Sequence, residues 1–209
     1  MNLITDIQYF PSVILFKNLN KITNIIFEQY DRHQKMSFRN RCQLAGADGI
    51  IQLSIPLGGG RDQRTIMKEV RIANKQDWQG QHWKTIVSCY SRSPWFEFYR
   101  DDLFRLYQRP FTFLLDWDLE CFEWVARMLG RTLEISITDS YREDYDKNEW
   151  LDLRGKIGPR TIGQLQESAP APKYRQVFEE RTGFLPGLSI LDLLFCEGKN
   201  ASRYIGGIS

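Results

Sequence analysis

Residues 3–28 decide the fold class, and they read LITDIQYFPSVILFKNLNKITNIIFE. The apolar run at Leu3–Ile7 predicts a short buried strand, and Pro11 can begin a helix that runs through Val13–Ile22. A second apolar run at Asn24–Glu28 predicts another buried strand. The opening is therefore predicted to be a β-α-β unit, whose crossover is right-handed if its two strands are parallel.

The loops that follow these two strands are the first place to expect a ligand. In an open α/β sheet the ligand crevice lies at the carboxyl ends of the strands. The loops at Gln8–Ser12 and Glu28–Lys35 should therefore face the same space. The second loop begins at Glu28 and also contains Tyr30 and Asp31, which are polar side chains at the expected edge.

A β-hairpin is predicted next, because Phe38–Leu44 and Ile50–Pro56 flank a turn with two glycines and an aspartate. Its first strand carries Arg39, Asn40 and Arg41. Alternate side chains of a strand point to opposite faces, so only the two arginines can readily converge. Two guanidinium groups on one face are suited to bind a carboxylate or phosphate. A solvated strand face is an equally common reason for such charges.

The remaining elements follow from hydrophobic periodicity and turn signals. We predict strands at Thr65–Ile72 and Thr132–Thr138, and helices at Asp77–Tyr90, Trp95–Arg109, Asp118–Leu129 and Leu188–Phe195. A mobile segment is expected at about 139–172, which is first charged without a clear period and then rich in Pro, Gly and Gln. The whole chain, 1–209, is predicted to be a single α/β domain with a mixed sheet, a β-α-β opening, an inserted hairpin and helices on both faces.

Composition limits the kind of partner. The 209 residues include 28 basic and 26 acidic ones, for a formal net charge of +2, so no long-range attraction to nucleic acid or membrane is expected. An anion site must be local. The four cysteines lack zinc or redox spacing, so free thiols and a cytoplasmic location are expected. No signal peptide and no transmembrane segment are predicted, because no run approaches the roughly 18 apolar residues of a membrane span.

The catalytic motifs of common enzyme classes are absent. Serine hydrolase, dinucleotide and phosphate-loop patterns do not occur, and neither His33 nor His82 has a metal-type partner, so no metal and no cofactor are predicted. His82 is a candidate general base because imidazole titrates near neutral pH, although a lone helix histidine is more often a structural hydrogen-bonding group. Asp152, Arg154 and Lys156 alternate, which places them on one face if the segment is extended. That face either binds an anion or meets water.

Several short segments resemble one known family. They are Q-Y-F-P near the start, F-R-N-R before a hairpin that ends in L-S-I-P, K-E-V-R-I-A-N, the Q-H-W helix, Y-S-R-S-P-W-F, and L-S-I-L-D-L-L-F-C-E-G. Their order and their span, about residues 4–198, are similar to the WbqC-like family. That resemblance implies a link to bacterial O-antigen and other surface-polysaccharide gene clusters. It also implies an acyl- or aminoacyl-type transfer, with glycine suggested, to a nucleotide-activated or lipid-linked amino sugar.

One segment departs from the family pattern. Many members have a His-Gln-Pro run where this chain has Thr5-Asp6-Ile7. If that histidine is catalytic in the relatives, this chain needs another base, and His82 in the matching Q-H-W segment is the available substitute. Positions that match the family are Arg39, Asn40, Arg41, Ser189 and Asp192.

These observations lead to a transferase hypothesis with assigned roles. Arg39 and Arg41 would hold a phosphate or carboxylate, and His82 or Glu28 would accept the proton from an attacking amine. The sugar would be lined by Tyr9, Tyr90, Trp95 and Tyr174, with Asn40, Asp152, Arg154, Lys156, Ser189 and Asp192 as further ligand-binding candidates. The alternative is a non-catalytic ligand-binding or regulatory module that retains the family pocket. Single-stranded nucleic-acid binding, a third hypothesis, would need strongly salt-dependent association and is disfavoured by the balanced charge.

Overall fold

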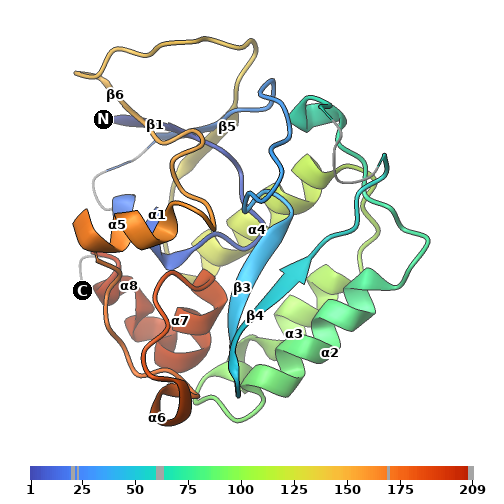
Figure 1. Cartoon of the computed structure of the whole chain (residues 1–209), viewed down its shortest axis with the longest axis vertical. Coiled ribbons are helices and arrows are strands. Elements are labelled where there is room, and N and C mark those ends of the chain that lie inside the picture. The colour runs from blue at the N-terminus through green and yellow to red at the C-terminus, as the bar shows by residue number, and fades with distance from the viewer. Residues whose placement is uncertain (20–21, 23, 60–63, 169, 207–209) are drawn as a thin grey trace.

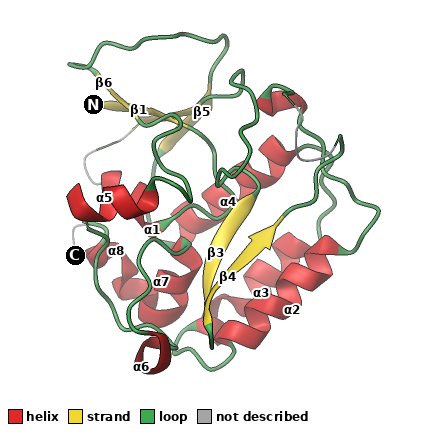
Figure 2. Ribbon diagram, in the orientation of Figure 1, coloured by secondary structure: helices red, strands yellow, loops and turns green. Residues whose placement is uncertain are grey.

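Two separate sheets organise the protein. The computed structural model describes residues 1–206 apart from 20, 21, 23, 60–63 and 169. A parallel sheet has the order β5-β2-β1-β6 and contains β1 (Asn2–Thr5), β2 (Asn24–Phe27), β5 (Glu134–Ile137) and β6 (Trp150–Asp152). An antiparallel hairpin contains β3 (Arg41–Gly46) and β4 (Gly49–Ser54). The predicted α/β class is confirmed, and the parallel and antiparallel pairings lie in different sheets (Figure 2).

The β-α-β opening is confirmed. β1 and β2 pair in parallel, with Leu3 opposite Ile25, and α1 (Val13–Asn18) connects them. Ser12 caps this helix, since its Oγ accepts a hydrogen bond from the backbone N–H of Leu15. The two apolar runs therefore became neighbouring strands of one parallel sheet, which brings the loops after both strands to the same edge.

Four longer helices lie where helices were predicted, and those predictions are confirmed. They are α2 (Trp78–Tyr90), α3 (Phe96–Tyr107), α4 (Leu114–Met128) and α7 (Ile190–Glu197). α2 packs against α3 and β3, and α3 packs against α4 and α7 (Figure 1). α2 is capped by Asp77, whose Oδ1 accepts from the N–H of Gly80 at 2.9 Å. The short helices are α5 (Ile162–Ser168), α6 (Glu179–Thr182), α8 (Ala201–Tyr204), and the 3-10 turns η1 (Met67–Glu69) and η2 (Gly198–Asn200).

The prediction of a strand at Thr65–Ile72 is wrong. Its centre is η1, closed by a hydrogen bond from Val70 N–H to the Met67 carbonyl, and only single bridges flank it. Met67, Val70 and Ile72 are buried, and the segment is joined by backbone hydrogen bonds to the loop at 29–33 and not to a strand. Within 139–172, β6 and α5 are regular elements that the sequence did not indicate. The mobility of that segment stays a prediction.

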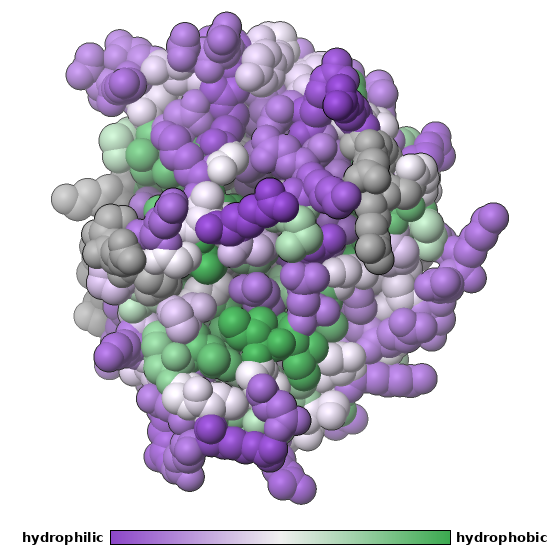
Figure 3. Space-filling model, viewed as in Figure 1, coloured by the Kyte–Doolittle hydropathy of each residue, from purple (hydrophilic) through white to green (hydrophobic). Residues whose placement is uncertain are grey.

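One hydrophobic core joins the described parts of the chain. It extends from Leu3 to Ile205 and includes fully buried rings such as Trp117 and Trp124. The four cysteines are free and buried within or beside it. In the described ranges, no helix has the length and apolar character needed to cross a bilayer. Hydrophilic side chains dominate the end of the molecule that carries the parallel sheet, and an apolar patch lies over the lower part of the hairpin (Figure 3).

Candidate functional site

Polar side chains collect where the parallel strands end. Glu28 follows β2 directly and is 1 % exposed. Its Oε1 accepts hydrogen bonds from the N–H of Tyr30 at 2.8 Å and from Thr138 Oγ1 at 2.9 Å, and its Oε2 lies 3.5 Å from Arg154 Nη1. Thr138 comes directly after β5, and Arg154 follows β6. Glu28 is thus enclosed by groups from three strand ends, and its carboxylate holds Arg154 and Thr138 in place.

Arg39 is an internal link and lines neither of the pockets described below. Its Nη2 donates to Asp6 Oδ1 and to Asp31 Oδ2, both at 2.5 Å, and its Nη1 donates to the carbonyl of Arg32. The residue is 1 % exposed. Burial alone would lower the pKa of the guanidinium, but Asp6 and Asp31 outweigh that effect and the pKa is raised. Asp6 also accepts from the N–H of Gly155 through Oδ2 at 2.6 Å.

The expected convergence of the two arginines is therefore not observed. Strand alternation does not apply to them, because Arg39 and Asn40 lie in a turn and β3 begins only at Arg41. Arg39 points into the protein and meets Asp6, whereas Arg41 lines an open cavity. Of the pair, only Arg41 can reach a ligand in that cavity.

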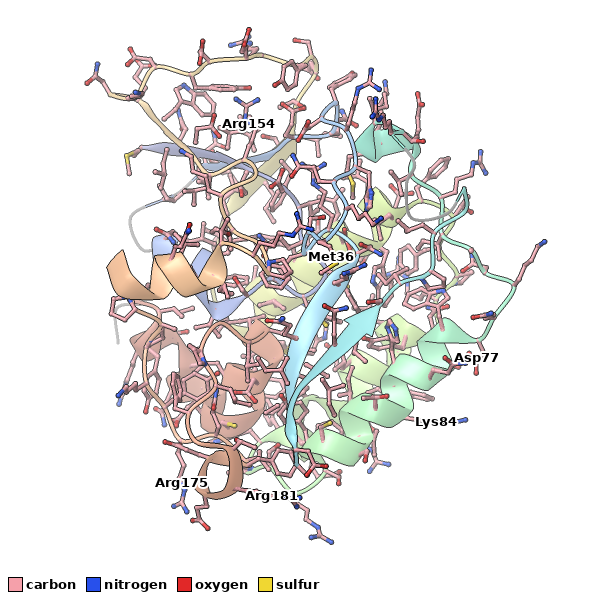
Figure 4. All side chains as sticks on the ribbon, in the orientation of Figure 1. Met36, Asp77, Lys84, Arg154, Arg175 and Arg181 are labelled. Carbon is pink, nitrogen blue, oxygen red and sulfur yellow. The ribbon has the colours of Figure 1, made fainter. Side chains whose placement is uncertain are left out.

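That cavity, which we call the hairpin pocket, lies between the 31–36 loop and the hairpin and has a volume of about 640 Å³. Met36, labelled in Figure 4, marks its position beside the start of β3, and Arg41 Nη1 lies 2.7 Å from the Met36 Sδ. Asn40 is fixed in the wall, since its Nδ2 donates to the carbonyl of Ile55 at 3.0 Å. The polar lining consists of His33, Lys35, Asn40, Arg41, Gln52 and Ser54. Among the described residues, this lining carries basic groups and no carboxylate.

A second cavity, the acidic pocket, has a volume of about 240 Å³ and is lined by Asp31, Gln34, Tyr141, Asp152, Arg154 and Gly155. Arg154 is held by Asp152, by the carbonyls of Arg142 and Glu143, and by the faces of two tyrosines. Burial would raise the pKa of Asp152, but its hydrogen bonds with Arg154 outweigh this and the pKa is lowered. Asp152 is therefore ionised at neutral pH. Lys156 donates through Nζ to the backbone carbonyl of Asp152.

The 31–36 loop separates the two pockets. Its residues His33, Lys35 and Met36 line the hairpin pocket, and its residues Asp31 and Gln34 line the acidic pocket. Arg39 fixes this loop through two of its residues, by bonds to the Asp31 carboxylate and to the Arg32 carbonyl. One anchored loop thus presents a basic face to one cavity and an acidic face to the other.

His82 and Tyr9 lie in the core behind the hairpin pocket. The Tyr9 hydroxyl is 2.9 Å from His82 Nδ1 and 2.5 Å from the Tyr107 hydroxyl. Burial lowers the pKa of His82 to about 4, and a hydrogen bond to the backbone of Ser54 acts in the opposite direction. The ring is therefore neutral at pH 7 and is occupied on both sides by protein groups. In this state it is a weak base.

The other predicted rings lie apart from both pockets. Tyr90 and Tyr174 each donate a hydrogen bond of 2.7 Å to the buried carboxylate of Asp192. Ser189 caps α7 and donates through Oγ to the Phe10 carbonyl at 2.9 Å. The indole of Trp95 covers Gly198, where an added Cβ would lie 2.1 Å from the ring. These four side chains and Asp192 hold α7 against the rest of the protein.

Several pocket residues were not among the predicted site residues. His33, Lys35 and Asp31 lie in the loop after β2, which the strand-end rule had indicated only as a segment. Gln52 and Ser54 alternate along β4 with the buried Leu53. A polar residue on the outer face of a strand usually meets water, so no local signal distinguishes these two from ordinary surface residues.

The fold and the pockets define an α/β protein with polar cavities where its parallel strands end. A comparison with protein-family models matches residues 7–163 to the WbqC-like protein family, and the chain belongs to that family. No curated protein and no solved structure is found to match. The matched range contains the lining of both pockets, whereas Tyr174, Ser189 and Asp192 lie outside it.

Proposed function

We propose that this protein is an acyl- or aminoacyl-type group transferase that acts on an activated or lipid-linked sugar in bacterial surface-polysaccharide biosynthesis. Family membership supports the general setting. The observation that carries the proposal is the pairing of a basic and an acidic pocket on the two sides of one anchored loop. Glycine is the candidate transferred group, and the buried free thiols suit a reducing cytoplasm as the place of reaction.

In this proposal the hairpin pocket binds the phosphorylated part of the sugar substrate. Arg41 and Lys35 supply positive charge, and a guanidinium can make two parallel hydrogen bonds to phosphate oxygens. Ile55, Pro56 and Leu57 form an apolar wall beside them, against which a flat ring can pack. The pocket volume of about 640 Å³ lies within the usual range for small-molecule sites.

The acidic pocket is proposed to hold the amino group. Asp31 and Asp152 line it, and the lowered pKa of Asp152 keeps that carboxylate charged when an ammonium group arrives. In the transfer, the ammonium first gives one proton to a carboxylate of this pocket. The free amine nitrogen then forms a bond to the acyl carbon of an activated donor while the bond from that carbon to the leaving group breaks, and the departing group takes the second proton from the nitrogen. Glu28, enclosed behind it, positions Arg154.

A non-catalytic binding module is the second candidate, and one observation favours it. The segment Thr5-Asp6-Ile7 stands where many relatives have His-Gln-Pro, and Asp6 is fully engaged by Arg39 and the Gly155 N–H. His82, the substitute base, is neutral and enclosed. A chain with intact pockets and no suitable base would bind the sugar without turning it over.

Thermal-shift measurements with nucleotide sugars, followed by mass spectrometry for a transferred glycyl group from activated glycine donors, test the proposal. We expect nucleotide amino sugars to stabilise the wild type and to gain a glycyl group. Arg41→Met should lose the stabilisation. Arg181→Met should keep it, because Arg181 lies on α6, at the far end of the molecule from Met36 and Arg154 (Figure 4).

The outcomes separate the two candidates. Stabilisation without product under all donors would leave only the binding module. If the protein shows no stabilisation and forms no product, both candidate functions are refuted. An unchanged shift in Arg41→Met would remove the hairpin pocket as the phosphate site.

A further inference from the structure

His33 occupies the wall of the hairpin pocket in an unusual state. The residue is only 8 % exposed, and among the described residues neither ring nitrogen has a hydrogen-bond partner. Asn40 is close enough to influence the ring, but the geometry of a hydrogen bond is not met. Buried polar atoms nearly always have partners, since leaving one unsatisfied is costly. A bound ligand can supply the missing partner.

The backbone around His33 is fixed. Its N–H donates to the Thr65 carbonyl at 2.9 Å, and the N–H of Met67 donates to the Asp31 carbonyl at 2.9 Å. Arg39 anchors the neighbouring Arg32 carbonyl. The imidazole is therefore attached to a segment that is held on both sides before any ligand arrives.

The charges near the ring are positive. Arg39 and Arg41 both disfavour a proton on His33, and Lys35 lines the same cavity. No carboxylate belongs to the part of the pocket lining that the structure describes. Burial and the two arginines lower the pKa of His33, so the ring is neutral at pH 7. An anion in the pocket reverses this balance, because it favours the charged ring.

We propose that the hairpin pocket binds the diphosphate group of the sugar substrate, and that His33 takes up a proton as the diphosphate binds and donates a hydrogen bond to it beside Arg41. The inference rests on the proposed transferase function and names the part of the substrate that the pocket recognises. A diphosphate diester is fully ionised at neutral pH, so the proton moves from solvent to the imidazole and not to the ligand. Nucleotide-linked and prenyl-linked sugars both carry such a diphosphate.

Proton uptake can be measured on the wild-type protein. The chain has two histidines, and the NMR signals of the His33 ring are those that disappear in His33→Gln. We expect its titration midpoint to rise when UDP-N-acetylglucosamine binds. Calorimetry at about pH 6.5 in buffers of different ionisation enthalpy should show uptake of roughly half a proton or more.

Two variants separate hydrogen bonding from protonation. His33→Leu should weaken diphosphate binding roughly 10-fold to 100-fold, the usual effect of losing a hydrogen bond to a charged group. His33→Gln retains a donor and should keep part of the affinity, but proton uptake should disappear. Lys84→Gln is the control, because Lys84 is exposed on α2 and points away from the protein (Figure 4).

Binding of two further diphosphate ligands distinguishes the possible sources of the diphosphate. Farnesyl-diphosphate-linked N-acetylglucosamine and symmetrical dimethyl diphosphate serve as the second and third ligands, and tighter binding of one sugar identifies the natural carrier. Binding without proton uptake, with both His33 variants at wild-type affinity, would overturn the inference and leave the transferase proposal standing. Absence of binding by all three diphosphates would also overturn it, and the mass-spectrometric product assay would then decide the transferase proposal separately.

Discussion

Removing the Arg39 guanidinium should destabilise the whole fold. Arg39→Met keeps much of the side-chain volume but leaves Asp6 and Asp31 without their shared cation and the Arg32 carbonyl without its donor. Removing one member of a buried ion pair generally costs about 3–5 kcal/mol, because the remaining charge is uncompensated.

The structure places the expected cost at the lower end of that range. The Asp31 side chain is 24 % exposed and can regain water, whereas the Asp6 side chain is only 8 % exposed. Asp6 also keeps the hydrogen bond from the Gly155 N–H. We therefore expect a loss of about 3 kcal/mol, mainly from Asp6. For a chain of this size, that corresponds to a fall in Tm of roughly 6–12 °C.

Urea unfolding followed by fluorescence measures the free energy of unfolding directly. Arg100→Met is the matched control, since the Arg100 side chain is 49 % exposed and its ion pair with Glu97 lies on the surface, so its loss should change stability by less than about 1 kcal/mol. Adding Asp6→Asn to Arg39→Met should recover part of the loss, because it removes the stranded charge and keeps an acceptor for Gly155. A loss below about 1 kcal/mol in Arg39→Met would refute the structural role of Arg39.

Three further predictions concern buried groups elsewhere. Tyr174→Phe removes a donor to Asp192 and should lower the free energy of unfolding by about 1–3 kcal/mol in urea titrations; an unchanged value would contradict the contact. Gly198→Ala should cost at least about 2 kcal/mol by the same assay, because the residue has a φ of 56° and its Cβ would meet Trp95. Burial raises the pKa of Asp118 well above the ordinary value for an aspartate, so the folded carboxyl keeps its proton where the unfolded one loses it. This group should make stability fall as pH rises above about 4, the ordinary pKa of an unfolded aspartate, and Asp118→Asn should flatten that dependence in unfolding measurements at several pH values.

The regular elements with local signals could be predicted from the sequence. The two apolar runs of the opening, the Gly-containing turn between β3 and β4, and the periodic helices each carry their pattern within a few residues. β6 could not be predicted in this way. It has only three residues, all half-buried, and it exists as a strand because it pairs with β1, almost 150 positions away. Thr65–Ile72 fails for the opposite reason, since its apolar pattern has no continuous strand partner.

The candidate site shows the same limit. Arg39 and Arg41 are the same residue type two positions apart, so the local sequence cannot show which of them binds a ligand. Their difference is decided by Asp6 and Asp31, which come from two other strand ends. Likewise, His82 looks available on a helix until Tyr9 and the backbone of Ser54 enclose it. His33, by contrast, has no motif around it, and only the folded loop reveals its unpartnered ring.

The net charge of +2 does not indicate the two pockets, because basic and acidic residues are grouped locally on opposite sides of the 31–36 loop. Arg39 pairs with both Asp6 and Asp31, and it anchors the loop that separates the two pockets. Lys35 and Arg41 lie on one side, and Asp31 and Asp152 lie on the other together with Arg154. A ligand with an anionic end and an amino end would be attracted at both ends and oriented across the loop, whereas a ligand of one sign would be favoured in one pocket and repelled from the other. In the proposed function this polarity favours an amino sugar diphosphate over a simple anion, and it depends on the buried guanidinium of Arg39, which lines neither pocket.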